Sequence, residues 1–265
     1  MNGKVLICAG SDSGGGAGIQ ADIKAVTALG GFAMTAITAL TAQNTLGVQG
    51  VLPVPVDFIR QQMRLVLDDL GADAIKTGML HDIATIEAVL AELPHGVPLV
   101  ADPVMVAKGG HPLLRPDAVE TLKAKLIPAA ALVTPNLPEA ELLAGHAIAG
   151  EADMERAGRT ILALGAQAVL MKGGHMEGET LVDLLVSPAG IARFASPRID
   201  TRHTHGTGCT LASAIATGLA QGMPLHDAVA RARRYVRAAI ETAPGYGHGH
   251  GPLNHAVTVD PSRIG

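Results

Sequence analysis

The sequence predicts an α/β protein of three layers, a doubly wound, mostly parallel central sheet with helices on both faces. Predicted strands alternate with predicted helices from one end of the chain to the other, as in a parallel sheet with crossover helices. The strands are near-continuous apolar runs, typical of strands covered on both faces. No repeat or linker-like change of composition divides the 265 residues, so we expect one domain over residues 1–265.

The composition narrows the class of protein. Hydrophobic residues make up 48% of the chain but include only three Phe, two Tyr and no Trp, so the core must consist of aliphatic residues with Met as filler. A net charge of −4 without a basic run argues against nucleic acid or an anionic membrane as partner. The two cysteines lie far apart, the N-terminus reads as a strand, and amides, Gly and Pro interrupt the uncharged stretch 25–56. We expect a soluble, cytoplasmic protein.

The first elements form a strand, a Gly-rich loop and a helix. Residues 4–9 are an apolar strand, residues 9–22 hold the loop, and apolar residues at helical spacing follow. This order is typical of a ligand loop at the carboxyl edge of an α/β sheet, although it fits neither a dinucleotide fingerprint nor a P-loop. The next predicted strand, 33–42, ends at Gln43, whose amide could bind a heterocycle or satisfy a loop.

The middle of the chain continues the alternation. We expect an edge or connecting strand at 51–56, where prolines exclude a central position. A helix over 57–70, a strand over 74–79, a helix from Asp82 to residue 93 and a strand over 97–105 follow. Asp102 lies in this last strand, just before a proline. Its carboxylate is a candidate for the metal or phosphate side of a site, and a turn aspartate is the plainer alternative.

The second half supplies further polar groups at strand ends. The predicted elements are a loop at 108–111, a helix over 117–127, a strand over 130–134, helices near 137–143 and 154–164, a strand over 168–172, a hairpin at 181–195 and a helix over 225–243. Asn136 and Glu139 begin a helix three residues apart, so their oxygens could converge on Mg²⁺ or merely cap the helix. Lys172, beside two glycines, could reach a phosphate.

Residues 203–211 are the strongest candidate for chemistry. Gly206 and Gly208 precede an apolar helix, and the free N–H groups and positive dipole end at such a helix start bind anions. Cys209 lies at this point, where the same field is expected to lower its thiol pKa. The alternative is a plain turn before a buried helix. The other strand-end groups favour a site, because the carboxyl ends of parallel strands meet at one edge of the sheet.

Taken together, these stretches suggest phosphoryl transfer and also match a known family. The chain resembles the hydroxymethylpyrimidine/phosphomethylpyrimidine kinases of thiamine biosynthesis, within the ribokinase-like kinases. The resemblance rests on AGSDSGGGAGIQAD (9–22), TALTAQNTLGVQ (38–49), KTGML (76–80), DPVM (102–105), TPNLPEAELL (134–143), MKGGH (171–175), HGTGCTLASAIA (205–216) and GHGHGP (247–252).

The resemblance implies one ribokinase-like domain, usually a homodimer, that uses ATP and Mg²⁺ to phosphorylate the hydroxymethyl group of the pyrimidine and then the monophosphate. It assigns the pyrimidine pocket to Gly10, Asp22, Gln43 and Met79. It assigns a water-mediated Mg²⁺ contact to Asn136 and Glu139, and a nucleotide phosphate contact to Lys172. We expect Asp102, Thr207 and His205 to contact the nucleotide as well. The catalytic group is then Cys209 with Gly206, Gly208 and Lys172, with the thiol in the place where the wider superfamily has an Asp.

Three alternatives stay open or are disfavoured. An apolar, aromatic-poor pocket would also admit a pyridine, so pyridoxal kinase activity is the second candidate. A non-catalytic binding protein on the same fold is a third, because fold does not fix function. A sugar or nucleoside kinase is disfavoured, because position 209 is not Asp and no lid insertion is evident near the N-terminus.

Overall fold

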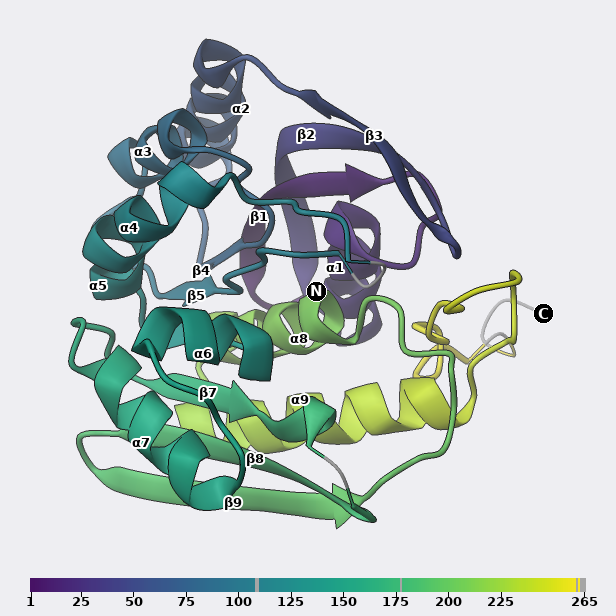
Figure 1. Ribbon diagram of the computed structural model, residues 1–265. Helices are drawn as coiled ribbons and strands as arrows, with labels where there is room; N and C mark the ends of the chain where they lie inside the picture. The colour runs from purple at the N-terminus through teal and green to yellow at the C-terminus, as the bar shows by residue number, and fades with distance from the viewer. Residues whose placement is uncertain (108–109, 177, 261, 263–265) are drawn as a thin grey trace.

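The computed structural model describes residues 1–107, 110–176, 178–260 and 262. Within them, nine strands form one sheet in the order β3-β2-β1-β4-β5-β6-β7-β8-β9 (Figure 1). The strands are β1 (Lys4–Asp12), β2 (Phe32–Asn44), β3 (Gly47–Pro53), β4 (Ala74–Thr77), β5 (Leu99–Ala101), β6 (Leu132–Val133), β7 (Val169–Lys172), β8 (Thr180–Ser187) and β9 (Gly190–Pro197).

The sheet is parallel at its centre and antiparallel at its edges. The neighbouring strands from β2 to β7 pair in parallel, whereas β3 pairs antiparallel with β2, and β8 pairs antiparallel with both β7 and β9. Strand order reverses at β1, which lies between β2 and β4. This is the topological switch point at which such folds bind ligands. The predicted hairpin is confirmed. The proline-containing strand lies at the edge of the sheet, but it spans Gly47–Pro53 rather than 51–56, since a helix begins at Val56.

Helices cover both faces of the sheet, as predicted. The α-helices are α1 (Gly18–Ala28), α2 (Val56–Asp69), α3 (Ile83–Ala91), α4 (Val119–Thr121), α5 (Ile127–Ala129), α6 (Leu137–Ala144), α7 (Glu151–Leu162), α8 (Thr207–Ala220) and α9 (Leu225–Glu241). Helices α1, α8 and α9 pack on one face and α2 to α7 on the other (Figure 1).

The side chains of β1 show how one strand serves both layers. Leu6 and Cys8 point into the core beneath α2 and α3, whereas Val5 and Ile7 point into the core beneath α1 and α8. All four are completely buried. Because successive side chains of a strand point to opposite faces, a continuous apolar run is required wherever both faces are covered.

Two predicted elements differ from the structure. The strand expected over 97–105 ends at Ala101, because Pro103 has no N–H with which to continue the ladder. The helix expected over 117–127 is a succession of short segments over 116–129, in which Leu122–Leu126 is π-helical. Pro128 lies two residues further on, and the widened turn before it relieves the clash between a helical proline ring and the carbonyl four residues earlier, here that of Ala124. Of the predicted loop 108–111, residues 108 and 109 lie outside the described residues.

The helices bear on the membrane question as well. In the described part of the chain, no helix combines the length and the apolar character that a bilayer crossing requires.

Candidate functional site

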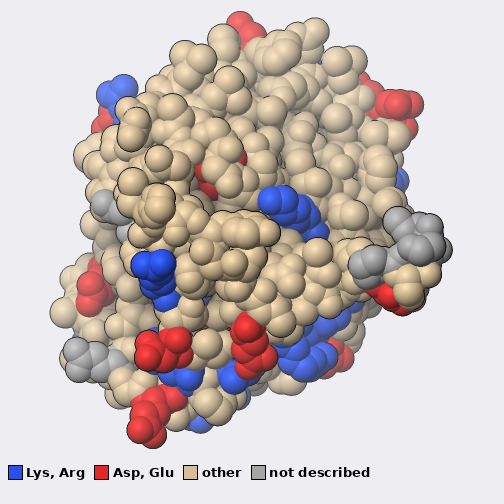
Figure 2. All heavy atoms as spheres, turned by 90° about the vertical axis from the view of Figure 1, so that its right-hand side faces the viewer, with Lys and Arg blue, Asp and Glu red and all other residues tan. Residues whose placement is uncertain are grey.

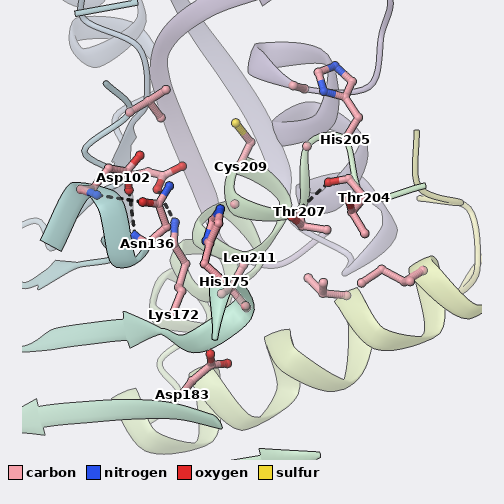
Figure 3. Close-up of a pocket in the computed structure, with 18 of the residues that line it drawn as sticks. Asp102, Asn136, Lys172, His175, Asp183, Thr204, His205, Thr207, Cys209 and Leu211 are labelled. Carbon is pink, nitrogen blue, oxygen red and sulfur yellow. Dashed lines mark hydrogen bonds and ion pairs between the residues drawn. The ribbon is translucent and has the colours of Figure 1, made fainter. Parts of the chain in front are cut away.

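A cavity of about 1590 Å³ opens at the carboxyl ends of the central strands. Loops that follow β1, β4, β5, β6 and β7 line it, together with the first turn of α8 (Figure 3). Every residue predicted for the site lines this cavity except Asp22. The predicted gathering of strand ends at one edge of the sheet is therefore what the structure contains.

The first turn of α8 forms the predicted anion site. We call it the cradle, the group of backbone N–H donors around Gly206 and Gly208. Gly206 caps the helix in the left-handed region, with φ of 84°, and a Cβ there would overlap the carbonyl oxygen of Gly16. Only glycine combines that backbone conformation with such a close approach. A Cβ on Gly208 would lie 3.3 Å from Lys172 Nζ, so the helix start faces the ammonium group. Free N–H groups beside a lysine favour a bound anion such as phosphate.

Lys172 and Asp102 form an ion pair on the wall of the cavity (Figure 3). Lys172 Nζ donates to Asp102 Oδ1 at 3.0 Å, and Thr134 Oγ1 donates to the same oxygen at 3.1 Å. Asp102 is 2% exposed. The hydrogen bonds join the ends of β5, β6 and β7 and hold a positive group toward the cradle.

Asn136 and Glu139 cap α6. Asn136 N–H donates to Glu139 Oε2 at 2.8 Å, and Glu139 N–H donates to Asn136 Oδ1 at 2.9 Å. Burial raises the pKa of Glu139 to about 7, with Lys172 opposing the rise and Asp102 adding to it. Glu139 therefore caps the helix, as the plainer alternative predicts. It also lines the cavity, where its carboxylate interacts electrostatically with Lys172 and Asp102.

Cys209 lies in the first turn of α8, beside the cradle, but its acidity differs from the prediction. Burial raises the pKa of the thiol to about 12, and Asp22 and Asp102 add to the rise, while Lys76 opposes it. The expectation of a lowered pKa was wrong, because loss of hydration outweighs the helix field in this enclosed position. Near neutral pH the group is a neutral thiol.

Asp22 needs a second correction, because its carboxylate does not reach the cavity. It is completely buried and accepts two hydrogen bonds from Lys76 Nζ, at 2.9 and 2.8 Å, and one from Ser213 Oγ at 2.7 Å. Lys76 is also completely buried yet lines the cavity. Asp22 therefore holds Lys76 rather than a substrate. Sequence reasoning missed Lys76, although a lysine in an otherwise apolar strand was a usable signal.

Gly10, Met79 and Gln43 line the cavity on the side of β1, β2 and β4. His205 belongs with them rather than with the predicted nucleotide residues, because its Nε2 lies 2.9 Å from Asp12 Oδ2 and 3.1 Å from Gln43 Nε2. Figure 3 shows His205 separated from Lys172 and Asp102, with Cys209 drawn between them. Thr207, the other predicted nucleotide residue, begins α8 and lines the cavity.

Fold and site together define a class of protein. An open α/β sheet with an anion cradle, a lysine and buried carboxylates at the carboxyl ends of its strands is suited to holding a phosphate and neutralising its charge. The described residues hold no cluster of three or more His, Cys, Asp or Glu side chains arranged to bind a metal by themselves.

Comparison with known proteins gives the family. Residues 12–254 match the phosphomethylpyrimidine kinase family, and the chain belongs to it. Its ribokinase-like α/β fold and its class, a kinase phosphotransferase, are those predicted.

Two relatives in sequence are notable. A thiamine biosynthesis bifunctional protein of Geobacter sulfurreducens is 53% identical over 98% of this chain, which spans only 54% of that longer protein. A hydroxymethylpyrimidine/phosphomethylpyrimidine kinase of Bacillus subtilis is 49% identical over 95% of this chain and 94% of its own.

Two solved structures are also similar. The ADP complex of Bacillus subtilis pyridoxal kinase superposes with a TM-score of 0.89 at 36% identity, over 97% of this chain and 98% of that one. A phosphomethylpyrimidine kinase from Clostridium difficile gives a TM-score of 0.79 at 43% identity, over 89% of this chain and 99% of that one.

Proposed function

We propose that this chain uses ATP to phosphorylate 4-amino-5-hydroxymethyl-2-methylpyrimidine and then its monophosphate, in thiamine biosynthesis. One observation carries the proposal. The cradle at the start of α8 lies between two groups of residues on the cavity wall, with Lys172 and Asp102 on one side and Gln43 and Met79 on the other. Family membership and the relatives' names support the same substrates.

The residues suggest how the reaction is assisted. The N–H groups around Gly206 and Gly208 bind the transferred phosphoryl group, and Lys172 neutralises charge that develops on it. Cys209 is a neutral thiol at the same helix start, so we assign it to orienting the substrate hydroxyl, whose proton passes to an oxygen of the transferred phosphoryl group as the hydroxyl oxygen attacks. Most of the rate enhancement then comes from positioning.

Mg²⁺ fits the acidic side of the cavity. Asp102 and Glu139 are buried carboxylates that both line it and face Lys172, and oxygen ligands of this kind are those that Mg²⁺ takes, directly or through water. We propose that Glu139, with Asn136, holds the ion through water. When bound, the ion neutralises phosphate oxygens. Nucleotide binding is supported by the ADP complex of the similar pyridoxal kinase, and we place the nucleotide near Lys172 and Thr207, which line the cavity at the cradle.

Pyridoxal kinase activity is the second candidate, favoured by that close structural likeness. The experiment that tests both candidates is ADP release by the purified protein with Mg-ATP and, in turn, hydroxymethylpyrimidine, its monophosphate and pyridoxal. We expect the highest kcat/KM with the two pyrimidines. Turnover with pyridoxal alone would transfer the function to the second candidate, and no ADP with any of them would favour a non-catalytic binding protein.

We further propose that residues 1–265 act as one kinase domain, in the cytoplasm, as a homodimer. Figure 2 shows few charged side chains on the upper part of one face, over β2 and β3. Leu46 and Leu52 there are 67% and 64% exposed, and Leu65 of α2 is 66% exposed. Apolar patches of this kind often mark interfaces.

Analytical ultracentrifugation tests the dimer. The native protein should sediment with twice the mass of the chain, and Leu52→Glu should shift the sedimentation toward that of the monomer. A monomeric native protein would refute the dimer.

A further inference from the structure

His205 connects Asp12 and Gln43 in a small hydrogen-bond network, and its two contacts determine where the imidazole proton lies. Its Nε2 lies 2.9 Å from Asp12 Oδ2 and 3.1 Å from the Gln43 side-chain amide. Asp12 is 3% exposed, and its carboxylate also accepts N–H groups from Gly14, Gly16 and Ala17. An acceptor so placed requires a proton on Nε2, because an unprotonated nitrogen at 2.9 Å would set two lone pairs against each other.

The proton on His205 decides which way the Gln43 amide points. A nitrogen that donates to Asp12 cannot also accept from an NH₂ group, so the Gln43 atom nearest to it must be the carbonyl oxygen. Amide oxygen and nitrogen are placed by their hydrogen bonds rather than by shape, and here the bonds favour the exchanged orientation.

Thr41 gives an independent argument for that orientation. Its hydroxyl donates to the Ser11 carbonyl at 2.9 Å, so its proton is engaged, and its oxygen can only accept from the Gln43 amide atom that lies 3.4 Å away. In the exchanged orientation, the NH₂ group of Gln43 donates to Thr41, and its oxygen shares the single Nε2 proton of His205 with Asp12 in a three-centre hydrogen bond. Both neighbours are then satisfied.

One N–H of Gln43 remains after these bonds are made. Gln43 lines the cavity, so this N–H is available as a donor to the unprotonated ring nitrogen of an aromatic heterocycle. We propose that Asp12 and His205 are positioning residues, which lock the Gln43 amide as a donor and thereby select substrates with a ring-nitrogen acceptor. The inference rests on the proposed function only in that the substrate is such a heterocycle.

The C-terminal segment 247–252 holds the network in place. Its Gly251 carbonyl accepts from the backbone N–H of His205 at 3.1 Å. Its His250 N–H donates to the Thr45 carbonyl at 3.0 Å, in the turn that follows Gln43. The segment therefore bridges the loop that carries His205 and the strand end that carries Gln43. The Gly-rich loop packs against the imidazole ring of His205, so closely that a Cβ on Gly16 would lie 2.5 Å from its Cδ2.

A double-mutant cycle tests the proposal by calorimetry. Dissociation constants for hydroxymethylpyrimidine and for ADP are measured for the wild type, His205→Ala, Gln43→Ala and the double variant. We expect His205→Ala to weaken pyrimidine binding by about tenfold, the loss of roughly one hydrogen bond, with little change for ADP. In the Gln43→Ala background the same change should add less than about twofold, because the residues act as a unit.

Further variants keep the test decisive. His205→Gln can present an N–H near the Nε2 position and should recover most of the affinity, and Thr41→Val should weaken pyrimidine binding even if His205→Ala fails to fold. The exposed His95, which does not line the cavity, supplies the matched control as His95→Ala. Additive losses in the cycle, or an equal loss for ADP, would overturn the proposal.

A failure of the proposed function can be told apart from a failure of this inference. If the wild type binds pyridoxal but not the pyrimidine, the function is reassigned, and the same cycle is run with pyridoxal. Non-additive losses of pyridoxal affinity with unchanged ADP affinity would then support the role of His205, and additive losses or an equal loss for ADP would refute it.

Discussion

At the scale of single residues, Cys209 illustrates how burial changes a predicted role. A thiol with a pKa of about 12 carries no charge near pH 7, so it contributes by orienting the substrate hydroxyl rather than by taking its proton. We expect Cys209→Ala to lower kcat by about 10²- to 10³-fold with little effect on the KM for ATP. Steady-state kinetics measure both constants.

Two further variants sharpen this prediction. Cys209→Ser keeps a neutral donor and acceptor and should retain clearly more activity than the alanine variant. Cys8→Ala is the matched control, because Cys8 is completely buried in β1 and does not line the cavity. A serine variant as slow as the alanine variant would indicate a thiolate base instead.

Glu139 gives a prediction about pH. Its pKa of about 7 is above the ordinary value for a glutamate, so the carboxylate is charged above pH 7 and neutral below it. The Mg²⁺ concentration for half-maximal activity should therefore rise as pH falls from 8 to 6, and Glu139→Gln should raise it at every pH and flatten the dependence. Glu141, on the same helix but not lining the cavity, supplies the control Glu141→Gln. Unchanged Mg²⁺ titrations of Glu139→Gln would exclude this residue from the ion site.

At the scale of elements, Lys76 and Asp22 join β4 to α1, and Ser213 adds α8. Removing one partner of a buried pair leaves an uncompensated charge, so Lys76→Met should lower the free energy of unfolding by about 3–5 kcal/mol. Lys76→Met with Asp22→Asn removes both charges and should recover most of that loss. Urea unfolding of the three proteins measures it.

Activity separates the structural role of Lys76 from its effect on the site. Lys76 lines the cavity and acts electrostatically on Cys209 at the start of α8, so its charge favours a phosphate bound there. The stable double variant should therefore still turn over at least about tenfold more slowly than the wild type. Full recovery of both stability and turnover would make the pair purely structural.

The same elements show what sequence reasoning can and cannot reach. Apolar periodicity located the strands and helices, and the strand-end rule predicted that Lys172, Asp102 and Asn136 meet at one edge of the sheet, where all three line the cavity. Asp22 and His205 were misplaced because their roles depend on contacts with residues 54 and 193 positions away. Local pattern contains no information on such pairs, nor on the burial that raises the pKa of Cys209.

At the scale of the whole molecule, the C-terminal region is joined to the helical layer of α8 and α9 through His255. Its Nε2 lies 2.9 Å from Thr210 Oγ1 of α8, and its carbonyl accepts from the hydroxyl of Tyr235 of α9 at 2.7 Å. Burial lowers the pKa of His255 to about 4, and the nearby charge of Lys24 adds to the effect. The native state thus keeps a neutral imidazole that accepts from Thr210.

The lowered pKa makes folding stability depend on pH in a defined window. Between pH 6.5 and 4, the unfolded chain protonates His255 while the folded protein does not, so the free energy of unfolding falls as pH falls through this range. The resulting loss of folding free energy is about 3 kcal/mol at pH 4 and is absent above pH 6.5. His255→Gln keeps a polar side chain without a titrating group, so its loss of stability between pH 7.5 and 4.5 should be smaller than that of the wild type by about this amount. Urea unfolding at the two pH values measures the difference, with the exposed His226→Gln as control. Equal losses in wild type and His255→Gln would mean that the imidazole is not held neutral, and that the C-terminal region does not couple protonation to the stability of the helical layer.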